Sequence, residues 1–144
     1  MIRVIHIKAD ASLARNTFHI NGDVQAGDGE VLMVQLQQFC LSPDARSNIQ
    51  TILGNDKNLN LMSSLSSVSL ESNTDNNIVS SRILGVFYRA TTFNNLYAGS
   101  QAPFTPISQR HLDRIEFWLE DDSGTRIAVP GNFSLSLVVK SVRA

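Results

Sequence analysis

An alternation of apolar and polar residues with a period of two dominates this chain, and it is clearest over residues 112–120. There Ile115, Phe117 and Leu119 share one parity, while the two glutamates of the segment and the only tryptophan, Trp118, take the other. Successive side chains of a strand point to opposite faces, so this pattern predicts a half-buried β-strand rather than a helix. The same parity predicts that Trp118 lies on the solvent side.

Eight or nine short strands are predicted, separated by turn sequences such as N-G-D, A-G-D-G-E, D-D-S-G-T and P-G. The predicted strands run from Ile2 to Lys8, Asn16 to Ile20, Glu30 to Cys40, Leu59 to Leu61, Val68 to Leu70, Ile78 to Tyr88, Leu112 to Glu120, Arg126 to Val129 and Phe133 to Val142. We expect bulges near Phe39, which shares the parity of the neighbouring glutamines, and at Gly85. D-D-S-G-T predicts a hairpin turn, and the strands at 112–120 and 133–142 are expected to close the sandwich as a hairpin-like pair.

One segment favours a helix, L-S-P-D-A-R-S-N-I-Q-T-I-L-G. Ser42 suits the N-cap, Pro43 the first helical position and Gly54 the residue that ends the helix, and we expect one or two turns. Many short strands with at most one short helix predict an all-β fold, an antiparallel, jelly-roll-like β-sandwich with residues 1–144 as a single domain. Strand order is not written in the periodicity, so another sandwich topology stays open.

Composition sets limits on function. The 144 residues carry a net charge of -1, and charged residues make up 17% of them. This gives no basic surface for nucleic acid or an anionic membrane, and we expect neither a signal peptide nor a membrane span. Cys40 is the only cysteine, which excludes an intrachain disulfide and favours a reducing compartment. Its place at the end of an apolar strand predicts a buried, inert thiol.

The sequence contains no residue pattern for catalysis or cofactor binding. His6, His19 and His111 lack metal-ligand spacing, and the first two would meet only if the first two strands paired. There is no G-x-S-x-G motif or phosphate-binding glycine loop, and the acidic residues collect in turns, where turn propensity explains them. We therefore expect no enzyme activity, no catalytic residue, no metal and no cofactor.

Three segments resemble a known group of proteins. They are I-H-I-K-A-D-A-S-L-A-R-N-T-F-H-I followed by V-L-M-V-Q-L-Q-Q-F, then R-I-L-G-V-F-Y-R-A-T-T-F-N-N-L-Y, and the pattern L-x-x-I-x-F-x-L-x-D-x-x-G leading to G-N-F-S-L-S-L. Their spacing is similar to that of small β-rich minor capsid, penton and spike-type virion proteins of large eukaryotic DNA viruses, virophages and Polinton-like elements. The resemblance implies a viral structural protein of the virion, assembled in the host cytoplasm or nucleus. Its implied partners are copies of itself and a major capsid protein.

A second function stays open, a β-sandwich module that binds a carbohydrate or a receptor. Side chains suited to such a site are Trp118, Tyr88, Tyr97, Phe93, Asn94 and Asn95. For a structural subunit, the candidate interface residues are Trp118, Glu116, Glu120, Tyr97 and Phe104. Aromatic residues are enriched at interface hot spots. The stretch 90–110 is expected to be an irregular arm that clasps a neighbour, with 99–107 dispensable for folding.

Overall fold

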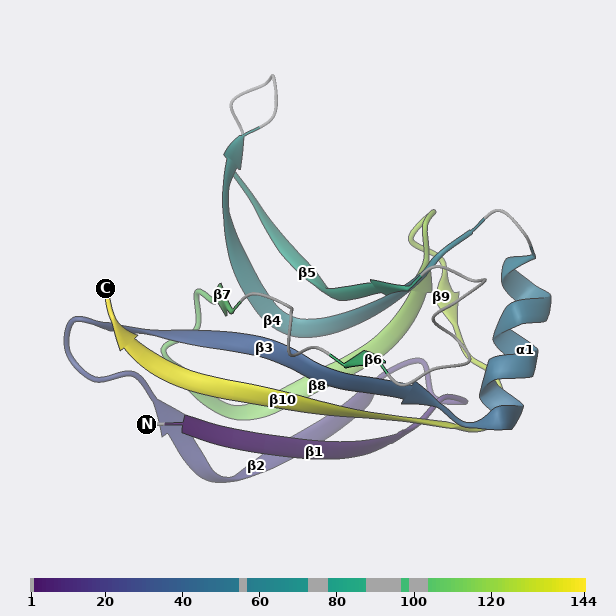
Figure 1. Cartoon of the computed structure of the whole chain (residues 1–144), viewed down its shortest axis with the longest axis horizontal. Coiled ribbons are helices and arrows are strands. Elements are labelled where there is room, and N and C mark those ends of the chain that lie inside the picture. Colours follow the sequence, from purple (N-terminus) through teal and green to yellow (C-terminus); the bar gives the residue numbers. More distant parts are fainter. Residues whose placement is uncertain (1, 55–56, 73–77, 88–96, 99–103) are drawn as a thin grey trace.

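The computed structural model of the chain describes residues 2–54, 57–72, 78–87, 97–98 and 104–144, with side chains described in 2–54, 57–65 and 104–144. The described residues form ten strands and one helix (Figure 1). In chain order these elements are β1 (Ile2–Asp10), β2 (Asn16–Gln25), β3 (Glu30–Leu41), α1 (Pro43–Leu53), β4 (Leu59–Ser72), β5 (Ile78–Phe87), β6 (Tyr97–Ala98), β7 (Thr105–Pro106), β8 (His111–Asp121), β9 (Arg126–Ile127) and β10 (Asn132–Arg143).

The strands form two antiparallel sheets that pack face to face (Figure 1). Sheet A has the order β1-β10-β3-β6, with β7 also paired to β3, and sheet B has the order β2-β8-β4-β5, with β9 also paired to β8. Each sheet interleaves strands from distant parts of the chain, and β1 pairs with β10 along its whole length. This interleaving is that of a jelly roll, which confirms the predicted fold class and decides between the two sandwich topologies.

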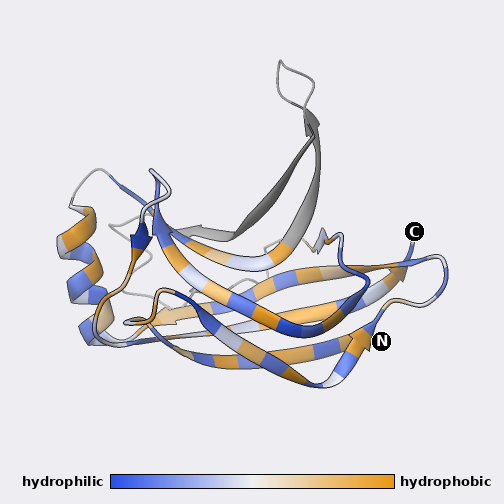
Figure 2. Ribbon diagram, turned by 180° about the vertical axis from the view of Figure 1, so that it is seen from behind, coloured by the Kyte–Doolittle hydropathy of each residue, from blue (hydrophilic) through white to orange (hydrophobic). Residues whose placement is uncertain are grey.

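The core lies between the sheets and takes one parity from each long strand, an alternation that Figure 2 shows as changing colour along the ribbons. The largest fully buried side chains are Phe117, Phe133, Leu32, Ile49, Leu59, Leu61, Ile115, Leu119, Leu137 and Val139. The ring centroids of Phe18 and Phe117 lie 6.1 Å apart. Because each such side chain contributes about 1.5–3 kcal/mol when it leaves water, this layer is the main source of stability.

Both predicted bulges are present. Where β10 pairs with β3, Leu135 lies opposite Phe39 but Leu137 lies opposite Leu36, so β3 holds an extra residue. The extra residue turns Phe39 into the core, where it is 4% exposed. In β5, the register with β4 shifts next to Gly85. The parity of Phe39 and the glycine inside the β5 strand thus located the two irregularities correctly.

Two predicted strand boundaries are wrong. The N-G-D sequence does not end β2, because the strand continues past it and pairs again with β8 at Val24. Gly22, with a φ of 76°, forms an irregular stretch inside the strand instead of a hairpin turn. The two short strands predicted between residues 59 and 70 are one strand, β4, because β5 pairs with it from Leu59 to Ser72.

The expected hairpin-like pair of strands at 112–120 and 133–142 is also wrong. These strands are β8 and β10, and they lie in opposite sheets. The D-D-S-G-T turn does form a hairpin, with Gly124 at a φ of 82°, but it joins β8 to the short strand β9. The first two strands, β1 and β2, are likewise in opposite sheets, so His6 and His19 are not cross-strand neighbours.

Helix α1 covers one end of the sandwich (Figure 1). It begins as predicted, since Ser42 Oγ accepts a hydrogen bond from Ala45 N at 3.3 Å, and Gly54 ends it with a φ of 64°. The helix has 11 residues, which is longer than the one or two turns expected. The added length is explained by packing, because Ala45, Ile49 and Leu53 form one buried stripe.

Candidate interaction surfaces

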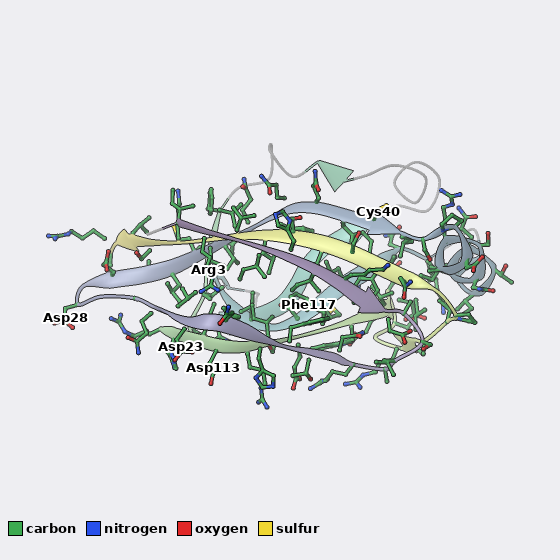
Figure 3. All side chains as sticks on the ribbon, turned by 90° about the horizontal axis from the view of Figure 1, so that it is seen from below. Arg3, Asp23, Asp28, Cys40, Asp113 and Phe117 are labelled. Carbon is green, nitrogen blue, oxygen red and sulfur yellow. The ribbon has the colours of Figure 1, made fainter. Side chains whose placement is uncertain are left out.

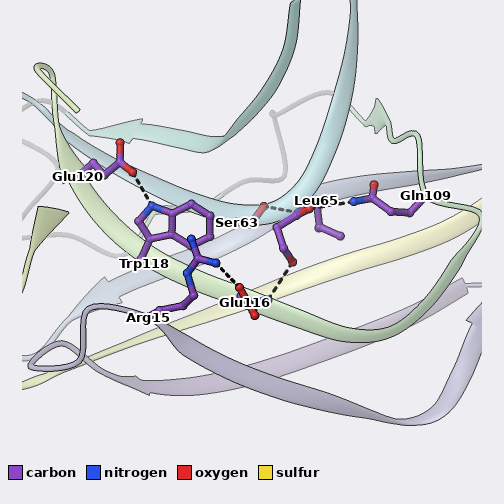
Figure 4. Close-up of polar contacts among 8 residues, drawn as sticks. Arg15, Ser63, Leu65, Gln109, Glu116, Trp118 and Glu120 are labelled. Carbon is purple, nitrogen blue, oxygen red and sulfur yellow. Dashed lines mark hydrogen bonds and ion pairs between the residues drawn. The ribbon is translucent and has the colours of Figure 1, made fainter. Parts of the chain in front are cut away.

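The only tryptophan lies on the outer face of sheet B but is not exposed. Trp118 has the outward parity of β8 and does not belong to the core, yet only 4% of its surface is accessible. The guanidinium carbons of Arg15 and Arg126 lie 4.2 Å and 5.6 Å from the centroid of its ring. Its indole Nε1 donates a hydrogen bond to Glu120 Oε2 at 2.5 Å (Figure 4). The predicted exposure of Trp118 is therefore wrong, because side chains of its own chain cover it.

Further hydrogen bonds fix the residues that surround the indole. Arg15 Nη1 forms an ion pair with Glu116 Oε2 at 2.6 Å, and Glu116 N donates to Ser64 Oγ at 3.0 Å (Figure 4). We call the following residues the tryptophan cluster: Arg15, Glu116, Trp118, Glu120 and Arg126. An exposed ion pair contributes only about 0–1 kcal/mol. The cluster therefore stabilises the fold mainly by keeping the indole out of water.

Phe104 lies on the outer face of the other sheet. Lys140 Nζ lies 3.9 Å from the centroid of its ring. Lys140 is opposite Ile2, which is 73% exposed, whereas the adjacent Val139 is fully buried, so this face of sheet A points away from the core. The tryptophan cluster and Phe104 are consequently on opposite sides of the molecule.

Tyr97 belongs to β6, where it pairs with Phe39 at the edge of sheet A. Its side chain lies outside the described side chains. The structure thus divides the five candidate interface residues into two groups. Glu116, Trp118 and Glu120 are on the outer face of sheet B, whereas Phe104 and the backbone of Tyr97 belong to sheet A.

Two exposed apolar residues on β1 were not predicted as surface residues from the sequence. Ile2 and Val4 are 73% and 47% exposed on the outer face of sheet A. Val4 lies opposite Val138, which is 8% exposed and outside the core. Because β1 carries aliphatic residues in both parities, the alternation in the sequence did not show which of them faces the solvent. The only available signal was the adjacent pair Val4-Ile5, which places an aliphatic residue on each face.

Cys40 is partly exposed rather than buried. It has the parity opposite to Leu41, which is buried, so its thiol points to the outer face of sheet A. There it lines a shallow hollow of 310 Å³ together with Lys8, Pro43 and Ser134. The prediction failed because the bulge in β3 shifts the parity of the residues that follow it.

The described residues contain no group of three or more histidine, cysteine, aspartate or glutamate side chains placed to hold a metal. His6 Nδ1 lies 2.7 Å from Ser136 Oγ, and His111 Nε2 lies 3.0 Å from Asp23 Oδ2. Of the residues suggested for a ligand site, 88 and 93–95 lie outside the described part of the chain, and Trp118 is covered. No helix in that part is long and apolar enough to cross a membrane.

The stretch 90–110 is described only at 97–98 and from residue 104 onward. Its final part is not a separate arm, because β7 pairs with β3. Ile107 is 5% exposed and donates its N–H to Leu32 O at 3.0 Å. Deleting 99–107 would remove this core residue, so the structure does not support the expectation that the whole segment is dispensable for folding. Residues 97–98 also pair with β3, and the remainder of the predicted arm lies outside the described residues.

Asp121 makes the β8–β9 turn sensitive to acid. Its buried carboxylate accepts hydrogen bonds from Thr125 N at 3.0 Å, Ser123 N at 2.8 Å and Lys57 Nζ at 3.3 Å. The Thr125 bond, helped by the other two, lowers the pKa of Asp121 against the opposing effect of burial. A lowered pKa stabilises the folded state above the unfolded value of about 3.9, and this stabilisation disappears as the pH falls through the lower folded value.

We therefore expect Tm to decrease when the pH is lowered below about 4. Asp121→Asn should lower Tm at pH 7, and its difference from the wild type should shrink toward pH 3. Asp28→Asn, in an exposed turn, is the matched control and should follow the wild type throughout. Thermal unfolding by circular dichroism between pH 7 and pH 3 measures both. A constant difference across this range would show that the Asp121 charge is not involved.

Comparison with known proteins gives a match in structure but none in sequence. No family model matches the chain, and no curated protein does so either. The crystal structure of the selenomethionine-labelled mavirus penton protein matches with a TM-score of 0.57 and 9% identity, over 98% of this chain and 99% of that one. The structure of infectious bursal disease virus strain Gx matches with a TM-score of only 0.34 and 17% identity, and 32% of that chain is covered. This chain thus has the jelly-roll fold of the mavirus penton protein.

Proposed function

We propose that the chain is a non-enzymatic structural subunit of a virus particle, a penton- or minor-capsid-type protein. The observation that supports this most is the agreement of fold with the mavirus penton protein over nearly the full length of both chains. That agreement covers 98% of this chain and 99% of the other, so it is not limited to one hairpin. The subunit acts by associating with copies of itself and by packing against other capsid proteins, a major capsid protein among them.

The outer surfaces are consistent with such a role. Ile2 and Val4 present aliphatic side chains to the solvent on sheet A, and Lys140, opposite Ile2, contacts the Phe104 ring. The strand that contains Tyr97 is at the other edge of the same sheet. On sheet B, Glu116 and Glu120 surround a covered indole, so this face would meet a partner through its polar side chains. The proposed site of action is the virion, with assembly in the host cytoplasm or nucleus, where the free Cys40 would remain reduced.

The decisive experiment measures copy number. We expect the chain to co-purify with intact particles at a fixed ratio to the major capsid protein. The purified chain should form a closed oligomer, seen by light scattering as a mass that is a whole multiple of 15.9 kDa. A chain that remains monomeric at high concentration and is missing from purified particles would contradict the proposal.

Two matched variants show which face is used. Ile2→Ser alters an exposed isoleucine on sheet A, and Ile52→Ser alters one that is 55% exposed on α1. Ile2→Ser should weaken self-association by about tenfold, since it removes apolar area worth about 1.5 kcal/mol or more. Ile52→Ser should leave the oligomer unchanged. Equal effects of both variants would show that the outer face of sheet A is not an interface.

A further inference from the structure

β1 is an edge strand, and among the described residues no strand pairs with its other side. The hydrogen bonds of Asp10 show to which side the backbone groups of β1 point. Asn16 Nδ2 donates to Asp10 O at 2.9 Å, and Asp10 N donates to Asn16 Oδ1 at 3.1 Å. Asp10 is opposite Asn132 of β10 but bonds to the Asn16 amide instead, so its N–H and C=O point away from β10. One side-chain amide thus takes the place of a neighbouring strand at this residue.

The same orientation applies to every second residue of β1. In an antiparallel strand the N–H and C=O of one residue point to the same side, and that side alternates along the chain. Val4, His6 and Lys8 share the parity of Asp10, and the pairing of β1 with β10 contains no register shift. Their N–H and C=O groups therefore point to the open edge. Strand edges of this kind are sites where another chain can add as a strand.

Next to this edge is an apolar hollow of 190 Å³ between β1 and β2. Its apolar lining comes from both sheets and consists of Val4, Ile5, Ile7, Phe18, Ile20 and Ile115. Arg3 donates hydrogen bonds to the carbonyls of Asn21 and Gly22 and so joins the two sheets at one end (Figure 3). A strand added to β1 would direct every second side chain into this hollow, where aliphatic side chains would fit.

The charges around the edge are of one sign. The charged side chains that line the 190 Å³ hollow and the 370 Å³ hollow on the other side of β1 are Arg3 and Lys8, and no carboxylate lines either. Asp10, at the end of the strand, is engaged by the Ser12 hydroxyl and amide. An acidic segment is therefore favoured. The β1 strand of a second copy is disfavoured, because its charged residues before Asp10 are again the basic Arg3 and Lys8.

We propose that the edge of β1 between Val4 and Lys8 accepts an extended segment of a different protein, alternating aliphatic and acidic residues, as an added strand. The aliphatic side chains enter the hollow between β1 and β2, and the acidic ones lie beside Lys8 and His6. This assignment deepens the proposed function, since it gives the attachment point for a neighbouring particle protein. Its test needs no assembly, so the two can fail separately.

The test uses a capped seven-residue peptide that alternates valine and glutamate, titrated calorimetrically into the purified chain. We expect saturable one-to-one binding, weakened about tenfold by lysine in place of glutamate, and abolished by N-methylation of alternate residues. On the protein, His6→Pro is compared with His6→Val. Both lack the imidazole, but only proline removes the N–H, so His6→Pro should fold normally and bind at least about tenfold more weakly than His6→Val.

Each other result overturns the proposal. Absence of peptide binding, or equal binding by the two His6 variants, would show that the edge does not accept a strand. Equal binding of the lysine peptide would show that the edge of β1 has no preference for acidic residues. Unfolding of His6→Pro would mean that the His6 N–H serves the pairing with β10. An oligomer that is lost in His6→Pro but kept in His6→Val would identify the occupant as a second copy of this chain.

Discussion

Gly131→Ala is expected to destabilise the fold by about 4 kcal/mol, because it combines backbone strain with a clash against backbone. Gly131 has a φ of 117°, a region that residues with a side chain rarely adopt. A Cβ at this position would lie 2.6 Å from Ala45 N and 2.8 Å from Ser42 Oγ. Ser42 caps α1 and also accepts a hydrogen bond from Asn132 N at 3.0 Å, so neither group can move freely.

Gly29→Ala is the matched control for this prediction. Gly29 has a φ of 73°, but no atom lies within 4 Å of the position of an added Cβ. It should therefore show the cost of the positive φ alone, about 1–2 kcal/mol. Denaturant unfolding of the two variants measures the difference. Equal losses would mean that the contact between the β9–β10 turn and the start of α1 is not tight.

Trp118→Ala is expected to cost about 3 kcal/mol of stability, even though the residue is on the outer face of its sheet. The indole is covered by Arg15 and Arg126, and its removal leaves their aliphatic stems and Glu120 without a packing partner. Trp118→Phe keeps an aromatic ring but loses the Nε1 bond to Glu120, and should cost about 1 kcal/mol. Urea unfolding provides the measurement.

The same variant separates a folding role from an interface role. If the indole supports the fold, Trp118→Ala should lower the free energy of unfolding while the folded protein keeps its oligomeric mass. If it contacts a partner directly, stability should stay near the wild type while the mass falls. The second result would show that the arginines move away from the indole when subunits meet.

Local features of the fold were largely predictable from the sequence. The parity of Phe39 located a bulge, and the order Ser42, Pro43, Gly54 defined both ends of α1, because these effects depend on neighbouring residues. The exposure of Trp118 was not predictable, since Arg15 comes from a distant loop and no periodicity connects the two. The strand order also depends on contacts between remote segments. The pairing of β8 with β9 and β4, rather than with β10, is one case.

The candidate surface residues, too, were predictable where the local pattern is regular and not elsewhere. Glu116 and Glu120 were placed correctly on an outer face, because the alternation in β8 is regular. Ile2 and Val4 were missed, because β1 has aliphatic residues on both faces. The open edge of β1 could not be predicted from the sequence, because it shows only in the hydrogen bonds between the Asn16 amide and the backbone of Asp10.

The place of β10 between β1 and β3 also sets the order in which the protein can be made. A ribosome releases β1 and β3 long before β10, yet each of them needs β10 as its neighbour in sheet A. Until then both strands have unsatisfied edges, and long-range pairing of this kind is slow and prone to aggregation. A nascent chain halted before β10 should depend on chaperones, and synthesis rate should affect the yield of folded protein more than it would for a fold with local pairing.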